Sequence, residues 1–150
     1  MRSRLPLGVL LVAVLLASCG DRPGVAVSIG GESVPMVLAS TTEGTACSTS
    51  HGDAFPQLAP LTTVRAVTPV ALHFEAGQGA TKIRGCIYDL DAQSQPGGPI
   101  EDFTLLGRSG AFEPRSMVAS RTYSVTVNVV WSFVVRQGEE THLFRLRIEP

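Results

Sequence analysis

The chain has 150 residues, of which 44% are apolar and 17% charged, and its 12 basic residues nearly balance its 13 acidic ones. A chain of this length forms about one domain. The composition excludes a polytopic membrane protein, a strongly basic nucleic-acid binder and a wholly disordered chain. What remains is a small globular domain.

The first 18 residues are predicted to be a cleaved secretory signal. Arg2 and Arg4 give it a positive start, and the stretch Leu5–Leu16 that follows is almost entirely apolar. These 12 residues are fewer than the roughly 20 that a permanent membrane-spanning helix needs. Small residues come next, as at a cleavage site. Removal of the signal would leave 10 basic and 13 acidic residues, a net charge of −3.

The signal ends in Leu16-Ala17-Ser18-Cys19, which resembles the lipobox of bacterial lipoproteins. In that family the cysteine sulfur takes a diacylglyceryl group, the signal is cleaved just before it, and the new N-terminus is often acylated as well. The resemblance implies that Cys19 is the lipidation site and that fatty acids such as palmitate anchor the exported protein to a bacterial membrane. Two or more acyl chains hold a domain on a membrane stably. The alternative is an ordinary signal peptide beside an unrelated cysteine.

Gly20 stands directly after this cysteine, where the family's inner-membrane retention signal has Asp. Which membrane the anchor reaches, and whether the domain faces the periplasm or the cell exterior, therefore stays open. We expect three segments: a signal peptide at 1–18, a lipidated tether at 19–24 and a single β-sandwich domain at 25–150.

Apolar and polar residues alternate with a period of two through most of the chain after the tether, which predicts β-strands, and helical stripes are missing. Strands are expected, in chain order, at 25–29, 34–38, 70–75, 82–89, 100–106, 122–133 and 142–148. About seven strands without helices favour an antiparallel β-sandwich of the immunoglobulin (Ig)-like kind, with a small β-barrel as the alternative. A cysteine on a strand and one buried tryptophan also suit an Ig-like sandwich.

Glycine and proline mark the connections between these strands. Gly30-Gly31 and Gln137-Gly138-Glu139 are predicted turns, and Pro35 marks its strand as an edge or a bulge. Residues 39–63 form a long connection, and 107–114 are expected to be loop. The last two strands are expected to form a long hairpin with one buried face and one wet face.

Two cysteines remain once the lipidation site is set aside. Because an exported chain matures in an oxidising compartment, we expect a disulfide between Cys47 and Cys86. Closing a loop of about 40 residues stabilises a fold by roughly 4 kcal/mol in the chain-entropy model. The alternative makes Cys47 a nucleophile with His51 as its base. No third group is marked to orient that base, so thiol catalysis is not expected.

The segment Ile29-Gly30-Gly31-Glu32-Ser33-Val34-Pro35-Met36, followed by a loop and Cys47, resembles the start of some small uncharacterised bacterial lipoproteins. Those proteins often carry aromatic residues beside this cysteine and a second cysteine soon after it. In this chain Ala46 and Ser48 flank the cysteine, and the next one is Cys86. The resemblance covers a small part of the chain and implies no activity.

Acidic residues gather on both sides of a Pro-Gly loop, and they are candidate Ca²⁺ ligands because hard cations take oxygens from adjacent loops. They are Asp89, Asp91, Glu101 and Asp102. The alternative is that such residues form turns at strand ends. No metal site is expected from the histidines His51, His73 and His142, whose spacing is wrong for ligands.

Two further pairs have both a functional and a structural interpretation. His73 and Glu75 lie on one face of a strand and are the start of a metal site or part of a solvated face. Arg145 and Arg147 share the outward face of the last strand. They either bind phosphate or carboxylate groups or protect an edge strand from pairing.

Phosphate loops, nucleophile elbows and zinc-protease motifs are absent from the sequence, so we expect no enzyme, no cofactor and no nucleic-acid partner. The expected function is that of a membrane-anchored binding or interaction module for another envelope protein, a surface polymer or a small ligand. Its expected contact surfaces are residues 39–63 and 96–99. The alternative function is that of a metal-ion-binding envelope domain.

Overall fold

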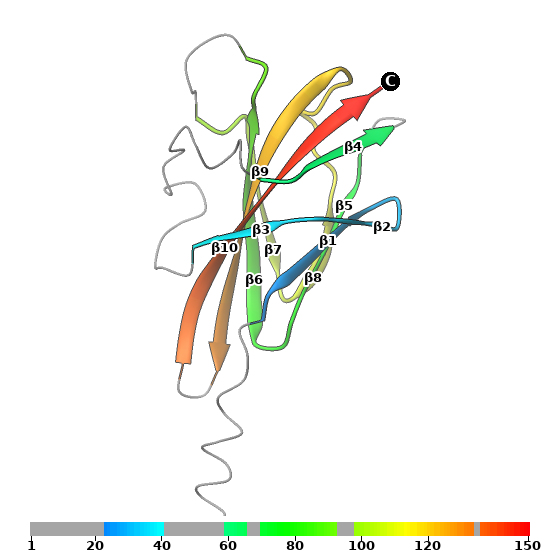
Figure 1. Cartoon of the computed structure of the whole chain (residues 1–150). Coiled ribbons are helices and arrows are strands. Elements are labelled where there is room, and N and C mark those ends of the chain that lie inside the picture. The colour runs from blue at the N-terminus through cyan, green and yellow to red at the C-terminus, as the bar shows by residue number, and fades with distance from the viewer. Residues whose placement is uncertain (1–22, 41–58, 66–69, 93–97, 134–135) are drawn as a thin grey trace, which may run out of the picture.

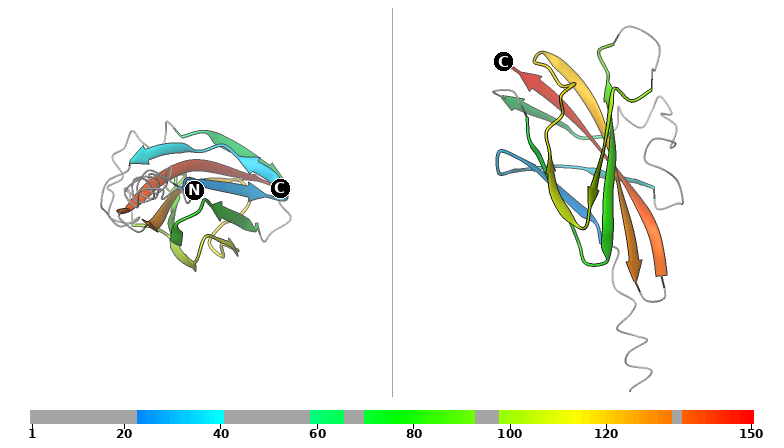
Figure 2. Two further views of the ribbon diagram at one scale, coloured as in Figure 1. Left: turned by 90° about the horizontal axis from the view of Figure 1, so that it is seen from below. Right: turned by 180° about the vertical axis from the view of Figure 1, so that it is seen from behind.

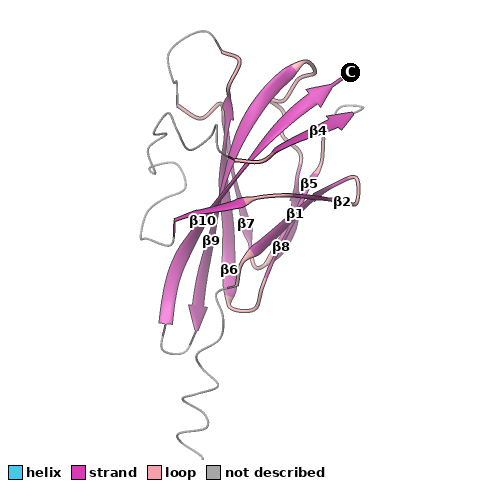
Figure 3. Cartoon of the chain, in the orientation of Figure 1, coloured by secondary structure: helices cyan, strands magenta, loops and turns pink. Residues whose placement is uncertain are grey.

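In the computed structural model, residues 23–40, 59–65, 70–92, 98–133 and 136–150 are described, and they form ten β-strands and no helix (Figure 3). The predicted all-β fold is therefore confirmed, with ten strands in place of about seven. The strands make two sheets that pack face to face (Figures 1 and 2). The described strands close no barrel, so the barrel alternative is wrong.

The smaller sheet has four antiparallel strands. Their spatial order is β2 (Glu32–Val34), β1 (Val25–Ile29), β5 (Leu72–Ala76) and β8 (Ser109–Phe112).

The larger sheet is built around a long hairpin. Its order is β7 (Glu101–Leu106), β6 (Ala80–Asp89), β9 (Arg121–Phe133) and β10 (Arg136–Glu149), with β3 (Val37–Ser40) and β4 (Leu61–Arg65) on the far edge of β10. Here β3 pairs with residues 141–143 of β10, and β4 pairs with residues 145–149. The β4–β10 pairing is parallel, whereas every other described pairing is antiparallel.

The facing sides of the two sheets form one apolar core. Alternate residues of β9 and β10 point into it because side chains in a strand alternate between faces. Tyr123, Val125 and Val127 contribute from β9, and Phe144 and Leu146 contribute from β10. All five are fully buried, as the alternating pattern predicts.

The order of the strands is that of an Ig-like sandwich. In β10-β9-β6-β7 the larger sheet has the order G-F-C-C′, and in β1-β5-β8 the smaller sheet has the order A-B-E. The chain crosses between sheets from β5 to β6, from β7 to β8 and from β8 to β9, as it does between the corresponding Ig strands.

A tyrosine near the start of β9 supports this assignment. The Val118 N–H donates a hydrogen bond of 2.8 Å to the Tyr123 Oη, and the Tyr123 hydroxyl lies 3.4 Å from the Val118 carbonyl oxygen. A tyrosine at the start of strand F that bonds a few residues upstream is the tyrosine corner of Ig-like domains. Burial raises the pKa of Tyr123, so its hydroxyl stays protonated at neutral pH.

The cysteine and the tryptophan that suggested an Ig-like sandwich from the sequence do not occupy the positions that these residues have in antibody domains. Antibody domains put the second intersheet cysteine two residues after the corner tyrosine, where this chain has Val125. Cys86 instead faces outward from β6, and it forms with Tyr88 a buried cluster separate from the main core. Trp131 lies on β9, the F strand, and not on the C strand.

One predicted strand and three predicted connections are corrected by the structure. The expected strand 34–38 is broken at Pro35, and its two parts belong to different sheets as β2 and β3. The long connection 39–63 contains β4, and the expected loop 107–114 contains β8. The predicted turn at 137–139 lies within β10, because Gly138 pairs with Trp131 and the strand begins at Arg136. These strands are short or rich in Gly and Ser, so their periodicity is weak.

The central part of the outward face of the long hairpin is also buried, contrary to the expectation of one wet face. Ser124 and Asn128 of β9 have no exposed surface, and Thr126 and Thr141 are 3% exposed. The Thr141 hydroxyl donates a hydrogen bond of 2.6 Å to the Asn128 side-chain oxygen. Polar residues at alternate positions thus mark the outer face, but they do not show that it is wet.

Aromatic side chains connect the two sheets on the side where their edge strands are β7 and β8. The Phe103 ring of β7 packs over Gly85 of β6, where a Cβ atom would overlap the ring. The ring centre of Phe103 lies 5.0 Å from that of Phe74 and 4.6 Å from that of Phe112, both in the smaller sheet. This aromatic group closes one lateral side of the sandwich.

Replacing Tyr123→Phe is expected to lower the free energy of unfolding by about 1–3 kcal/mol, because the partly buried Val118 N–H loses its acceptor. Urea unfolding of the purified protein measures the loss. Thr104→Val removes a hydroxyl from an exposed position of β7 and should change stability by no more than about 0.5 kcal/mol. Equal stability of Tyr123→Phe and the unmodified protein would refute the corner assignment.

Candidate binding cleft

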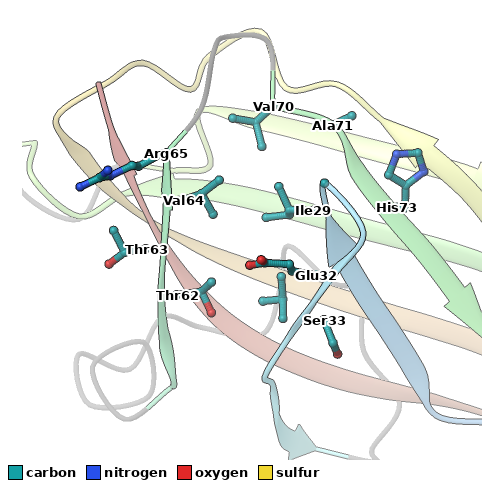
Figure 4. A pocket seen from close by; sticks show the side chains of 12 residues that line it. Ile29, Glu32, Ser33, Thr62, Thr63, Val64, Arg65, Val70, Ala71 and His73 are labelled. Carbon is teal, nitrogen blue, oxygen red and sulfur yellow. The ribbon is translucent and has the colours of Figure 1, made fainter.

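Among the described residues, nothing covers the other lateral side of the sandwich next to β4. The smaller sheet ends there in β2, and the larger sheet ends in β3 and β4. The chain passes from one sheet to the other through Pro35 and Met36, which close the part of this side next to β3. Between β2 and β4 a cleft of about 540 Å³ remains (Figure 4), which we call the open-side cleft. Its volume is in the range of small-molecule and peptide-anchor sites.

The β1–β2 turn forms one rim of the cleft. Gly30 and Gly31 have φ values of 59° and 85°, and a two-residue hairpin turn with both φ values positive favours glycine. The turn pairs Ile29 with Glu32, so both side chains lie on the same face of the sheet as the core residue Val27. A carboxylate is thus placed on the core-facing side of an edge strand.

The opposite wall comes from β4. Thr62 and Val64 point across the cleft toward the β1–β2 hairpin, whereas Thr63 and Arg65 point away from it (Figure 4). The strand is held in place at its start, where the Arg145 side chain and backbone N–H donate hydrogen bonds of 2.8 and 2.9 Å to the Ala59 and Pro60 carbonyls.

The cleft has an apolar floor with two polar groups that lack partners. Ile29 and Val64 pack against the core from either wall, and Val70 belongs to the core itself. The Glu32 carboxylate points toward β4 and has no hydrogen bond or ion pair with the rest of the described chain (Figure 4). The Thr62 hydroxyl oxygen is buried without a hydrogen-bond partner. This arrangement can accept N–H donors from a ligand that also covers apolar surface.

A second hollow, of about 660 Å³, lies on the outer face of the smaller sheet. It is lined mainly by small side chains, and His73 and Glu75 rise from β5 into it, both exposed as predicted. Ser28 flanks His73 in the register with β1, but no hydrogen bond joins them within the described structure. His142 is remote from this face: its Nε2 lies 3.3 Å from Glu140 Oε2 on β10. The described histidines do not come together.

Three of the four acidic candidates for Ca²⁺ binding already have protein partners. Asp89 forms an ion pair with Arg121 and accepts a hydrogen bond of 3.0 Å from the Asp91 N–H, and Asp91 accepts one of 2.6 Å from the Thr122 N–H. Glu101 holds a separate loop. Within the described ranges, His, Cys, Asp and Glu side chains form no group of three suited to a metal ion. These contacts agree with the interpretation that the acidic residues form turns at strand ends. Binding of Ca²⁺ stays a prediction.

Glu101 connects the start of β7 to the loop before β9. Its carboxylate accepts hydrogen bonds of 3.0 and 2.9 Å from the Arg115 and Ser116 N–H groups and one of 2.5 Å from the Ser116 hydroxyl. Burial opposes ionisation of this carboxylate, but the hydrogen bonds from Ser116 and then Arg115 outweigh it, and the pKa of Glu101 is lowered. Asp102, its neighbour, is exposed on β7.

The arginine pair does not protect an edge strand, because β10 has neighbours on both sides. Arg145 anchors the start of β4, and the Arg147 guanidinium donates a hydrogen bond of 3.1 Å to the Thr122 hydroxyl of β9. Both side chains therefore connect strands of the larger sheet. The anion-binding interpretation has no support from these contacts.

The remaining predicted sites fall on residues that are not described. Cys19, Cys47 and His51 lie outside the described residues, as do the signal peptide and most of the 39–63 connection. Lipidation, the Cys47–Cys86 disulfide and its thiol-enzyme alternative therefore stay predictions. Cys86 itself is fully buried. No helix in the described part of the chain is long and apolar enough to cross a membrane.

Sequence reasoning missed the two polar groups of the open-side cleft. A signal existed for Glu32, because a two-residue Gly-Gly turn pairs it with Ile29 and so directs it to the core side. No comparable signal existed for Thr62, whose strand was hidden in the expected connection.

Comparison of the chain with protein-family models, with curated proteins and with solved structures finds no match.

Replacing Glu101→Gln is expected to lower the free energy of unfolding at neutral pH by about 1–3 kcal/mol, because the charge that strengthens these hydrogen bonds is lost and the amide N–H₂ faces the Arg115 N–H donor. A lowered folded-state pKa stabilises the protein above the ordinary carboxyl pKa of about 4.3, and this contribution is lost as the pH falls through the folded-state value. The difference in free energy of unfolding between the unmodified protein and Glu101→Gln, measured by urea unfolding, should thus become smaller as the pH is lowered. Asp102→Asn is the matched control, and an equal effect of both changes would contradict the Glu101 contacts.

Proposed function

We propose that this protein is an exported, membrane-anchored bacterial lipoprotein whose β-sandwich is a binding module, and that the open-side cleft is its binding site. The observation that carries this proposal is the unpartnered Glu32 carboxylate over an apolar floor, between two strand edges. Pockets with an apolar lining and a few convergent polar groups are the usual form of binding sites.

The anchor and the cleft belong to opposite ends of the domain. The first described residue, Pro23, is held at the β5–β6 turn, where the Gly77 N–H donates a hydrogen bond of 2.8 Å to its carbonyl. A tether from Cys19 to Pro23 spans at most about 14 Å at about 3.6 Å per residue. The cleft lies near the β1–β2 turn, at the end of the sandwich nearer the C-terminus (Figure 1). A lipid on Cys19 would therefore present the cleft away from the membrane.

Contacts around the candidate sites support binding more than catalysis. A serine nucleophile needs a base in hydrogen-bond reach, and His73 makes no such bond to Ser28 in the described structure. Asp89, Asp91 and Glu101 hold loops and strand ends. The metal-binding alternative retains His73 and Glu75 on the outer face of the smaller sheet. Metal analysis of protein purified without chelators distinguishes it from the binding proposal.

Replacing Cys19→Ser is expected to abolish incorporation of labelled palmitate and to move the protein from the membrane fraction to the soluble fraction or to an unprocessed form. The physical reason is that the cysteine sulfur carries the diacylglyceryl anchor in the lipobox family. Cys47→Ser is the matched control and should keep the label. Labelling that survives in Cys19→Ser would overturn the anchor.

A photo-crosslinking amino acid placed at Ser33, an exposed residue that borders both the open-side cleft and the outer hollow, is expected to form a light-dependent adduct in intact cells. The same amino acid at the exposed Ala26, which borders only the outer hollow, should form none. Intact mass after irradiation is the measurement. Equal adducts at both positions, or none at Ser33, would count against the cleft as the binding site.

A further inference from the structure

The walls of the open-side cleft are two unpaired strand edges. In the described structure β2 pairs only with β1, and β4 pairs only with β10. Each edge strand presents a row of backbone N–H and C=O groups that a further strand can pair with. Extended peptides bind such edges, with main-chain hydrogen bonds for affinity and side-chain pockets at alternate positions for specificity.

The size of the cleft suits a short extended segment. The five residues of β4 make an edge about 16 Å long at about 3.3 Å per residue, enough to pair with a segment of similar length. Alternate side chains of such a segment would point into the sandwich, over the apolar floor of Ile29, Val64 and Val70. The other side chains would point to solvent.

The negative charge of Glu32 indicates that one inward side chain of the bound segment is basic. The Glu32 carboxylate only accepts hydrogen bonds, points toward β4 and is exposed, with no partner among the described residues. The Thr62 hydroxyl oxygen opposite it is buried without a hydrogen-bond partner. A Lys or Arg side chain entering between the walls can donate N–H hydrogen bonds to the exposed Glu32 carboxylate. Apolar side chains two positions before and after it would cover the floor.

We infer that the open-side cleft binds an extended peptide segment of a partner protein, which adds as a strand to β4 and places a basic side chain against Glu32. This inference rests on the proposed function and specifies its ligand. The competing interpretation is that Glu32 is an inward-pointing charge that keeps the edge from pairing at all.

The test uses a display library of random ten-residue peptides, selected on the detergent-extracted mature protein. We expect enrichment of peptides with Lys or Arg flanked by apolar residues two positions away. The same selection on Glu32→Lys should enrich acidic residues at that position. Synthetic copies of the enriched basic peptides should bind Glu32→Gln at least about tenfold more weakly than the unmodified protein, as for loss of a charge-assisted hydrogen bond. Glu75→Gln, exposed on the outer face, is the matched control and should bind as tightly as the unmodified protein.

Hydrogen exchange of the complex should show new protection of the backbone amides of β4. Near-ultraviolet circular dichroism verifies that each variant is folded. The inference is overturned if no peptide is enriched, if enrichment is the same with Glu32→Lys, or if butylguanidine alone binds as tightly and β4 gains no protection. Concentration-dependent dimerisation that blocks the cleft would also overturn it, in favour of a second copy. If any of these results is obtained together with a Ser33 adduct, the proposal of a binding module is retained and only the inference of a peptide ligand is rejected.

Discussion

The β9–β10 pairing is the interaction on which the rest of the structure depends. Its register runs through 13 residue pairs, from Phe133 with Arg136 to Arg121 with Ile148. On one side β9 pairs with β6, and through it with β7; on the other side β10 pairs with β3 and β4. Because side chains alternate between faces, a shift of one residue would turn every core side chain of a strand outward. The apolar residues at alternate positions of both strands therefore fix the register, and the register fixes where each neighbouring strand attaches.

The cleft follows from how the far edge of β10 is shared. A short antiparallel strand, β3, uses residues 141–143, and a parallel strand, β4, uses residues 145–149. Pro35 interrupts the strand that comes from the smaller sheet and lets it change sheets beside β3 only. Within the described ranges the side next to β4 is left open, and Glu32 is exposed at that point.

Most charged groups near strand ends stabilise the fold. Arg84 pairs with Glu139 across the larger sheet, and Arg121 pairs with Asp89 at the start of the hairpin. Glu101 fixes the loop before β9: its Oε1 accepts a hydrogen bond from the Arg115 N–H, and its Oε2 accepts hydrogen bonds from the Arg115 and Ser116 N–H groups. These groups exchange water for fixed donors and acceptors, which is the usual way in which buried or half-buried charges are tolerated. The Glu32 carboxylate differs from these groups, because it is exposed beside the open-side cleft and has no partner among the described residues.

The sequence by itself determined the fold class, the core face of the long hairpin and the outward direction of His73 and Glu75, because period-two alternation records which face of a strand is apolar. It did not determine the short strands β4 and β8, whose few residues carry little periodicity. It also misplaced the hairpin turn, because Gly138 inside a strand resembles a turn residue when its cross-strand partner Trp131 is unknown. The burial of the outer face and the open-side cleft were decided only by tertiary structure. Both depend on which strands become neighbours, and that choice is made between residues far apart in the chain.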